Sequence, residues 1–345
     1  MSDLIDRQDP AALVRGAPGA RIGSLEALLT NSDPLIRSPD RPWLLSPFDL
    51  QAVKAAGVTF AASLLERVVE EQARGDPAVA LSIRQALSDE IGADLSRVRP
   101  GSPDAERLSL ALRARGLWSQ YLEVGIGPDP EIFTKAQPMS SVGFGADVGL
   151  HPRSVWNNPE PEVVIAVSSR GEVVGASLGN DVNLRDFEGR SALLLGKAKD
   201  NNASAAIGPF IRLFDGGFTL ADVESAEVSL TVEGEDGFVL QGSSSMSQIS
   251  RAIGELVEAA MGAYHQYPDG MALFLGTMFA PTQDRDRPGG GFTHKIGDIV
   301  TVRSERLGAL VNRVNTSDRA APWRFGARAL MVNLAGRGLI GAPVE

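Results

Sequence analysis

Apolar residues recur at helical spacing in the first third of the chain. Between Pro47 and Arg74 they alternate with Glu and Arg, which predicts one or two helices. A second helical stretch, from Asp104 to about Tyr121, follows a connection rich in Pro, Gly and Ser at 99–103. Residues 1–115 are therefore predicted to form a smaller, mainly helical domain.

After Gly125 the pattern changes to short β-rich runs separated by Gly, Pro and Asn. One helical stretch, 247–264, interrupts them, and the Pro- and Gly-rich segment 282–291 predicts a mobile loop. Residues 116–345 are therefore predicted to form a mainly antiparallel β domain, which makes the protein α+β. The predicted strands are 162–168, 172–179, 207–214, 224–233, 238–241 and 298–303.

Composition excludes several classes of partner. The chain has 345 residues, and its 43% hydrophobic content can bury a large core without crosslinks. Its net charge of -10 opposes binding to nucleic acid or to an anionic membrane. No apolar stretch approaches the roughly 20 residues of a membrane helix, and the acidic start MSDLIDRQDP is unlike a secretory signal. We therefore expect a cytoplasmic protein with no nucleic-acid or membrane partner.

Three acids converge if residues 160–181 form a β-hairpin. Two apolar runs flank Arg170-Gly171, which is the pattern of a hairpin turn. With those two residues as the turn, paired positions sum to 341, so Glu160 faces Asp181. Glu162, two residues along, points to the same face of the sheet. Carboxylates about 5 Å apart repel one another unless they are protonated or a cation neutralises them.

A divalent cation is the favoured explanation for this cluster. The chain has no cysteine, so a bound metal needs oxygen or imidazole ligands. Three carboxylates leave room in an octahedral shell for water or a bidentate substrate, which favours Mg²⁺, or else Mn²⁺, over Zn²⁺. The alternative is that the acids are solvated at a strand end. A slip of one residue in the register would separate them.

Several motifs resemble those of the fumarylacetoacetate hydrolase family, in the family's order, over roughly residues 131–312. The resemblance implies a rolled β sheet and metal ligation by Glu160, Glu162 and Asp181. The matching segments are Glu160-Pro161-Glu162, Asp181-Val182-Asn183-Leu184-Arg185-Asp186, Lys199 to Gly208-Pro209, Leu275-Gly276-Thr277 and Gly297-Asp298-Ile299-Val300-Thr301-Val302.

Within the family, the chain is most similar to the 2-keto-3-deoxy-pentonate dehydratases that act on D-arabinonate or D-xylonate derivatives. Segments 130–135 and 154–162 and the tail containing Ala321-Pro322-Trp323 carry this similarity. It implies a Mg²⁺-dependent lyase that converts a 2-oxo sugar acid to 2-oxoglutarate semialdehyde in oxidative pentose catabolism. It also implies a homodimer or homotetramer assembled through the β domain.

The resemblance assigns proton transfer to Lys199 and Glu131. Dehydration needs a base near carbon 3 and an acid near the hydroxyl that leaves carbon 4. Lys199, its pKa lowered by burial or a nearby cation, is the candidate base, or it binds the substrate carboxylate. Glu131 is the candidate acid. Arg185 and Thr277 are candidate substrate-binding residues, although a structural ion pair and a turn hydroxyl explain them equally simply.

Two other functions remain open. One is a hydrolase that cleaves a carbon-carbon bond in an acylpyruvate or 2,4-diketo acid. Family members of that type use a His-Glu pair on a lid; no equivalent pair is evident, but His151 lies nine residues before Glu160. The other is a metal-stabilised binding protein, which the full set of chemical groups argues against. His265 and His294 are expected to be structural or exposed, with no partner acid evident for His294.

Overall fold

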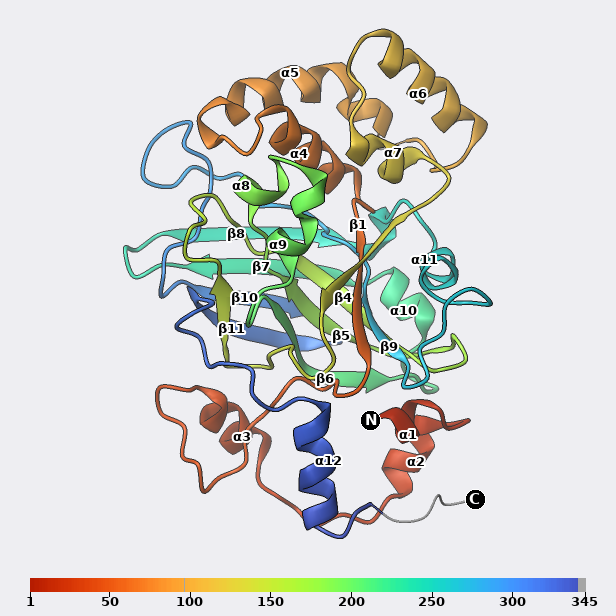
Figure 1. Ribbon diagram of the computed structural model, residues 1–345, viewed down its shortest axis with the longest axis vertical. Helices are drawn as coiled ribbons and strands as arrows, with labels where there is room; N and C mark the ends of the chain where they lie inside the picture. The colour runs from red at the N-terminus through yellow and green to blue at the C-terminus, as the bar shows by residue number, and fades with distance from the viewer. Residues whose placement is uncertain (96, 341–345) are drawn as a thin grey trace.

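The strands form two sheets in the computed structural model, which describes residues 1–95 and 97–340 (Figure 1). Within these residues, neighbouring strands are antiparallel except in the pairs β1–β9 and β3–β11. The prediction of an α+β, mainly antiparallel fold is therefore confirmed. The larger sheet has the order β2 (Glu131–Ala136), β1 (Ala52–Gly57), β9 (Met271–Phe274), β4 (Pro161–Val167), β5 (Val173–Asp181), β6 (Ala205–Leu213). The smaller sheet has the order β3 (Asp147–Leu150), β11 (Gly308–Thr316), β10 (Ile299–Ser304), β7 (Glu227–Glu233), β8 (Val239–Ser245).

The main hydrophobic core includes side chains from both sheets. Val163 and Leu178 of the larger sheet share one buried cluster with Leu230 and Val302 of the smaller. Strand β4 is also covered on its other face, where Val164 belongs to a separate buried cluster. Since both faces are buried, β4 is a continuous apolar run rather than an alternating one. The site described below begins at one end of this strand.

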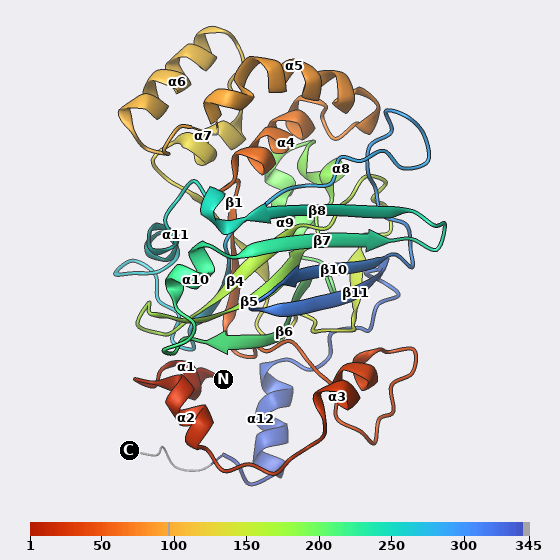
Figure 2. The ribbon, with the colours of Figure 1, turned by 180° about the vertical axis from the view of Figure 1, so that it is seen from behind.

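Helices gather at the two ends of the molecule (Figures 1 and 2). One group, here called the cap, packs its own apolar side chains together, among them Leu64, Val68 and Leu112. The cap consists of α4 (Ala61–Gln72), α5 (Pro77–Leu95), α6 (Pro103–Ala114) and α7 (Gln120–Ile126). At the opposite end lie α1 (Ser2–Ile5), α2 (Pro10–Gly16), α3 (Leu25–Ser32) and α12 (Ala327–Gly336). The remaining helices are α8 (Arg185–Glu188), α9 (Leu195–Lys199), α10 (Leu220–Glu224) and α11 (Ile253–Ala260), with 3-10 turns at Ala192–Leu194 and Met246–Gln248.

The prediction of helix throughout 47–74 is wrong, because residues 52–57 form strand β1 and only α4 is helical. A short apolar run does not reveal by periodicity whether it is strand or helix, and pairing with β2 and β9 decides here. The helix predicted from Asp104 to Tyr121 breaks near Gly116, which has a φ of +70°. The domain boundary at residue 115 stays a prediction.

The predicted strands correspond to β4, β5, β6, β7, β8 and β10, with shifted ends. The helix expected at 247–264 is shorter and is α11. The loop 282–291 is anchored by Arg285, which donates to the two Asp298 oxygens at 2.7 and 2.8 Å; its mobility stays a prediction. Within the described residues, no helix has the length and apolar character needed to cross a membrane.

Candidate metal centre and active site

The β4–β5 hairpin pairs as predicted near the acids. Paired positions from Pro161 to Ala166 sum to 341, and the Asp181 amide donates to the Glu160 carbonyl oxygen at 3.0 Å. The turn differs from the prediction, because the Ser168 amide bonds the Glu172 carbonyl and leaves three residues, 169–171, in the loop. A bulge at the end of β4 absorbs the extra residue, so the register at the acids is unchanged.

Glu160, Glu162 and Asp181 therefore form one buried cluster, here called the acid trio. Each offers an oxygen within 4.8 Å of the others. All three side chains are almost fully excluded from solvent. Like charges in such a site destabilise the fold unless cations or protons neutralise them.

Glu162 is the member of the acid trio without a cationic partner among the described residues. Its carboxylate accepts hydrogen bonds from the Gly276 amide at 2.8 Å and the Thr277 hydroxyl at 3.2 Å, which are neutral donors. Burial, together with the charges of Asp181 and Glu160, raises the pKa of Glu162 well above its usual range. The site thus disfavours an ionised Glu162 unless a further cation is present.

Two buried lysines face the acid trio. Lys199 Nζ lies 2.5 Å from Glu160 Oε2 and 3.3 Å from Asp181 Oδ2. Lys135 Nζ lies 2.7 Å from Asp181 Oδ1 and donates to the carbonyl oxygen of Lys199 at 2.5 Å. Burial alone would lower the pKa of Lys199, but the carboxylates of Asp181 and Glu160 outweigh it and raise the pKa. The surrounding side chains thus shift this pKa in the direction opposite to the expected lowering, and the effect of a bound cation on it stays a prediction.

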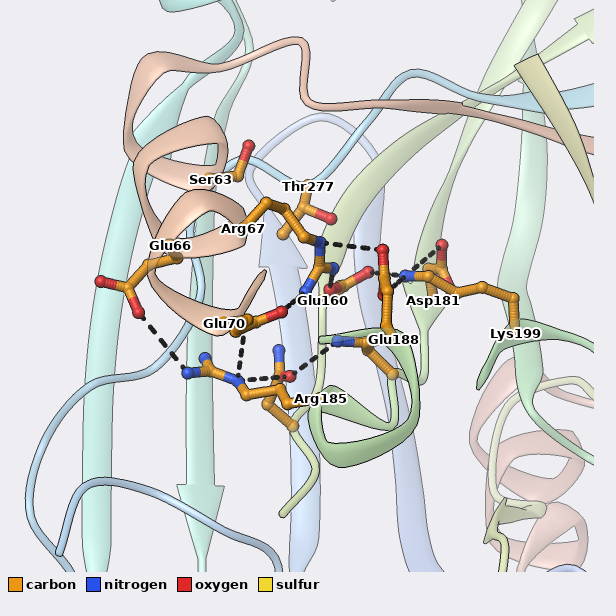
Figure 3. Close-up of polar contacts among 12 residues, drawn as sticks. Ser63, Glu66, Arg67, Glu70, Glu160, Asp181, Arg185, Glu188, Lys199 and Thr277 are labelled. Carbon is orange, nitrogen blue, oxygen red and sulfur yellow. Dashed lines mark hydrogen bonds and ion pairs between the residues drawn. The ribbon is translucent and has the colours of Figure 1, made fainter. Parts of the chain in front are cut away.

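The cap and α8 add two charged residues that the motifs did not indicate (Figure 3). Arg67 of α4 ion-pairs with Glu160, with Glu70 at 2.5 Å, and through Nε with Glu188 Oε1 at 3.2 Å. The second oxygen of Glu188 accepts no hydrogen bond in the described residues and lies 3.8 Å from Lys199 Nζ. Burial raises the pKa of Glu188 despite these two cations. A fourth carboxylate therefore lies beside the acid trio.

Arg185 lies in an ion-pair network next to this group. Its Nε lies 3.3 Å from Glu70 Oε1, and its Nη1 lies 3.5 Å from Glu66 Oε2. Arg84 also binds Glu66 through two hydrogen bonds, at 2.6 and 2.8 Å. Arg185 does not belong to the lining of the cavity described next. These contacts favour the structural ion pair over direct contact with a substrate.

A small cavity lies between the sheet and α4. Its volume of about 10 Å³ is room for about one water molecule. The Glu131 side chain lies over Gly57 of the neighbouring strand β1. A side chain at position 57 would therefore collide with the Glu131 carboxylate. Burial raises the pKa of Glu131. The lining brings together Ser63, Arg67, Glu131, Phe133, Asp181, Glu188, Lys199 and Thr277 with residues 56–58.

The contribution of the cap has no distinct signal in the sequence. Ser63, Glu66, Arg67 and Glu70 form the polar face of an amphipathic helix, a pattern typical of a solvated face. The structure shows that this face is buried as well, and its charged residues find their partners in the site beneath it. For Glu188, the only indication in the sequence that it lies near the site was its position seven residues after Asp181.

The donor set fits a hard divalent cation. All three oxygens of the acid trio are carboxylate oxygens, the type that Mg²⁺ and Mn²⁺ prefer. In the surrounding charged group, carboxylates outnumber cationic side chains, so the site has room for added positive charge. The carboxylates are Glu66, Glu70, Glu131, Glu160, Glu162, Asp181 and Glu188, and the cations are Arg67, Arg84, Lys135, Arg185 and Lys199.

The histidines lie outside the cavity lining. His151 packs against the Phe187 ring with centroids 5.2 Å apart, and its Nδ1 accepts from the Arg153 amide. His294 does have a partner acid, contrary to expectation, because its Nδ1 lies 3.1 Å from Asp298 Oδ2. The turn at 296–297, closed by the Asp298 amide donating to the Lys295 carbonyl oxygen at 3.2 Å, brings the two side chains together.

The chain matches known proteins over the region that holds this site. The family model described as "Fumarylacetoacetate (FAA) hydrolase C-terminal" matches residues 128–315. A probable 2-keto-3-deoxyxylonate dehydratase of Haloferax volcanii is 33% identical over 199 residues, which are 57% of this chain and 64% of the relative. A 2-dehydro-3-deoxy-D-arabinonate dehydratase of Saccharolobus solfataricus is 30% identical over 185 residues, 54% of this chain and 58% of the relative. The matches thus span less than two thirds of either relative.

Solved structures share the fold over a longer range. A 2-keto-3-deoxy-D-arabinonate dehydratase complexed with magnesium and 2,5-dioxopentanoate matches with a TM-score of 0.59 and 22% identity, covering 90% of each chain. The apo form of a protein of that name matches with a TM-score of 0.61 and 21% identity over the same shares. At such identities the likeness concerns the fold.

Proposed function

The chain belongs to the fumarylacetoacetate hydrolase family, and we propose that it is a Mg²⁺-dependent hydro-lyase acting on a 2-keto-3-deoxy-pentonate. The product would be 2,5-dioxopentanoate, which is 2-oxoglutarate semialdehyde, and the place of the reaction would be cytoplasmic oxidative pentose catabolism. One observation carries the proposal. Lys199, Glu131 and Asp181 of the acid trio line a single cavity, in a chain whose curated relatives are named as dehydratases of such acids.

Glu160, Glu162 and Asp181 are the proposed ligands of the ion. When bound, Mg²⁺ would polarise the 2-oxo group and so acidify the protons on carbon 3 of the substrate. The Gly276 amide and the Thr277 hydroxyl, which are neutral groups, hold the Glu162 carboxylate by hydrogen bonds. The negative charge of this carboxylate therefore stays available to the ion. We therefore propose that Thr277 acts mainly by positioning Glu162, and that Arg185 positions the cap against the site through Glu66 and Glu70.

Lys199 and Glu131 are the proposed proton carriers for loss of water. Glu131 takes a proton from carbon 3, and the Lys199 ammonium gives one to the carbon 4 hydroxyl, which leaves as water. A double bond then joins carbons 3 and 4. This assignment reverses the roles expected from the sequence, and its support is the ion pairing of Lys199 Nζ with Glu160 and Asp181, which favours the protonated amine.

Formation of the aldehyde needs further proton transfers, for which we propose Glu188. A proton must leave carbon 5 while one is added at carbon 3, which moves the double bond between carbons 4 and 5 and gives an enol. Transfer of the enol proton to carbon 4 then yields the aldehyde. The Glu188 carboxylate lies on the cavity wall with one oxygen free of hydrogen bonds. We expect the Glu188→Gln variant still to remove water from the substrate but to form the aldehyde about 100-fold more slowly than wild type.

That prediction is measured by separating the isomeric products. The unsaturated 2-oxo acid absorbs in the ultraviolet as a conjugated enone, whereas the product without the double bond does not and is identified by its aldehyde proton in an NMR spectrum. Aldehyde formation at the wild-type rate in Glu188→Gln would remove Glu188 from the mechanism. Glu258→Gln, which changes an exposed acid on α11, is the matched control.

Substrate entry requires the cap to move. A five-carbon acid does not fit a cavity of about 10 Å³. Arg67 ties α4 to Glu160 and Glu188 across that cavity, so an incoming substrate would compete for the guanidinium. We propose that α4 moves outward during entry and that Arg67 then binds a substrate oxygen.

The proposed function is tested with purified protein, Mg²⁺ and each stereoisomer of 2-keto-3-deoxy-pentonate. Mass spectrometry should detect an aldehyde one water lighter than the substrate, formed by wild type and by Glu258→Gln but not by Glu160→Gln. No product from any isomer would refute the dehydratase. Within residues 1–95 and 97–340, no contact of His151 favours the hydrolase, because this side chain packs against Phe187 outside the cavity lining.

A further inference from the structure

The cap is inserted between two residues that face each other in the larger sheet. Strand β1 ends at Gly57, and the chain returns to the sheet at Glu131 of β2, which is the partner of Gly57 in the antiparallel pair. The chain therefore enters the cap at 58–60, here called the entry crossing, beside the point where it leaves at 127–130, the exit crossing. A rigid group attached at two neighbouring points can rotate about the line that joins them.

Both crossings are continuous with the cavity. Val58 of the entry crossing lines the cavity together with Ala56 and Gly57. Glu131, the proposed base, directly follows the exit crossing and lies in the same lining. A shift of either crossing would therefore displace a wall of the cavity or the Glu131 carboxylate.

The entry crossing is held by Ser250. Its amide and its hydroxyl both donate to the Thr59 carbonyl oxygen, at 2.8 and 2.9 Å. The Thr59 hydroxyl in turn donates to the Leu275 carbonyl oxygen at 2.7 Å. The preceding residue, Val58, has a φ of +47°, which a β-branched residue rarely adopts. Such a conformation persists where the surrounding structure enforces it, and these hydrogen bonds fix the adjoining backbone.

The exit crossing is held by Arg251, whose side chain is 6% exposed. Its Nη2 donates to the carbonyl oxygens of Val124 and Gly127, both at 2.8 Å, and its Nη1 donates to that of Pro128 at 3.3 Å. Carbonyl groups at the C-terminal end of a helix lack partners within the helix, and Arg251 supplies them at the end of α7. Because its donors are charged, these hydrogen bonds are stronger than neutral ones.

The dipeptide Ser250-Arg251 is itself fixed to the rest of the protein, here called the body. It lies between the 3-10 turn Met246–Gln248 and helix α11. Met246 before it, and Ile253 and Leu256 after it, are buried in the main hydrophobic core. One short segment of the body therefore holds both chain crossings of the cap.

Elsewhere, side-chain contacts join the cap to the body. Arg67 of α4 ion-pairs with Glu160 of the acid trio. Trp156, which lies just before β4, packs among the buried apolar residues of the cap. Such contacts can separate while the chain stays intact, whereas the crossings keep their covalent connection to β1 and β2. An opening motion would therefore part the cap from the body at these side chains and turn about the crossings.

We propose that Ser250-Arg251 is the pivot of the cap and that Arg251 is a positioning residue for Glu131. When the cap opens for substrate, the crossings stay on the pivot, so closure returns Glu131 and α4 to the same place. The catalytic part of this inference rests on the proposed function, in which Glu131 takes a proton from carbon 3. The mechanical part concerns only the orientation of the cap and is independent of the reaction.

Distance measurement by electron paramagnetic resonance tests the mechanical part without substrate. The chain has no cysteine, so Val79→Cys on α5 and Tyr264→Cys after α11, at residues 43% and 102% exposed, can carry two spin labels. The labelled protein should give one narrow distance distribution. Arg251→Met should broaden it about twofold, because three carbonyl groups lose their donor. The matched control is Arg99→Met, since Arg99 joins the cap to Glu255 of α11 at the surface and is 77% exposed. The control should keep the narrow distribution.

Turnover tests the catalytic part. Arg251→Met should lower kcat about tenfold relative to Arg99→Met, with a smaller change in KM, because Glu131 loses its fixed place. Arg251→Lys keeps the charge but has one nitrogen in place of the two that donate here, so it should restore part of kcat and give a distribution of intermediate width.

A distribution in Arg251→Met as narrow as in wild type would overturn the pivot, even in a variant that unfolds at lower urea. If Arg251→Met does not fold, the wild-type width in Arg251→Lys would overturn it equally. A kcat equal to that of Arg99→Met, in a variant with the broad distribution, would remove Arg251 from the positioning of Glu131. A wild type without turnover would refute the dehydratase, and the distance distributions would still decide the pivot.

Discussion

Replacing Arg67 with Met should destabilise the protein strongly at neutral pH. The guanidinium is buried and ion-pairs with Glu70, Glu160 and Glu188, whose side chains are also buried. Met fills most of the volume but leaves these carboxylates without a shared cation. Breaking a buried ion pair by removing one partner costs about 3–5 kcal/mol, and the three pairs share one cation, so we expect a loss of about 4 kcal/mol.

The loss should depend on pH in a defined direction. Burial alone would raise the pKa of Glu160, but Arg67 and Lys199 outweigh it and lower the pKa to about 2. A lowered pKa in the folded state contributes stability above the unfolded value of about 4.5, and this contribution is lost as the pH falls towards 2. Without Arg67 the pKa of Glu160 rises, so the carboxyl takes up a proton at a higher pH than in wild type. The difference between wild type and Arg67→Met should therefore be largest at pH 7 and smaller at pH 4.

Urea unfolding followed by tryptophan fluorescence at both pH values measures this difference. Arg99→Met is the matched control, because Arg99 is 77% exposed and pairs only with Glu255 at the surface. It should change the stability by less than about 0.5 kcal/mol. A loss below about 1 kcal/mol in Arg67→Met, or a loss that is the same at pH 7 and pH 4, would refute the idea that Arg67 neutralises buried carboxylates.

Three further predictions concern the metal, the cavity and the acid limit of stability. Mg²⁺ at 100 times its Kd should stabilise wild type by about 2.7 kcal/mol, which thermal unfolding with and without EDTA would measure. The Glu162→Gln variant should lose most of this stabilisation. An equal stabilisation of both proteins would count against the metal site. Gly57→Ala should reduce turnover at least about tenfold, because the added Cβ displaces the Glu131 carboxylate. The control Gly254→Ala, where an added Cβ meets no atom within 4 Å, should keep the wild-type turnover. Equal turnover in the two variants would contradict this role for Gly57. Burial alone would raise the pKa of Asp298, but hydrogen bonds from Arg285 and His294 lower it to about 2. Its contribution of about 2 kcal/mol is therefore present above pH 4 and lost towards pH 2, and Asp298→Asn should unfold at lower urea at pH 7 but close to wild type at pH 2.

The acid trio could be predicted because a hairpin is a local structure. A turn at 169–171 fixes which residues of β4 and β5 face one another, so Glu160 and Asp181 follow from counting along the chain. The miscounted turn did not matter, since a bulge at the end of β4 compensated for it. The family motifs supported the same residues independently, although they did not predict the direction of the shift in the pKa of Lys199.

The contribution of the cap could not be predicted in the same way. Arg67 lies ninety-three positions from Glu160, and their contact depends on how α4 packs over the larger sheet. Strand β1 shows the same limit, because its place between β2 and β9 is set by partners at positions 131–136 and 271–274. No spacing rule connects such distant segments. In the sequence, the charged residues of α4 form the polar face of an amphipathic helix, and only the packing of the folded chain buries that face over the site.

The metal ligands and the proposed proton carriers come from different parts of the fold. The backbone pairing that brings the acid trio together belongs to one hairpin and involves no residue of the cap. The groups that would act on carbons 3, 4 and 5 come from separate segments: Glu131 from β2, Lys199 from the end of α9 and Glu188 from α8. Arg67 links the trio to Glu188 and to α4. A change in the packing of α4 would therefore move Arg67 relative to Glu160 and Glu188 and change the room for substrate, while the hairpin pairing that brings the acid trio together would remain. Under the proposed function, the cap and the short helices around it, more than the metal ligands, would decide between dehydration and bond hydrolysis.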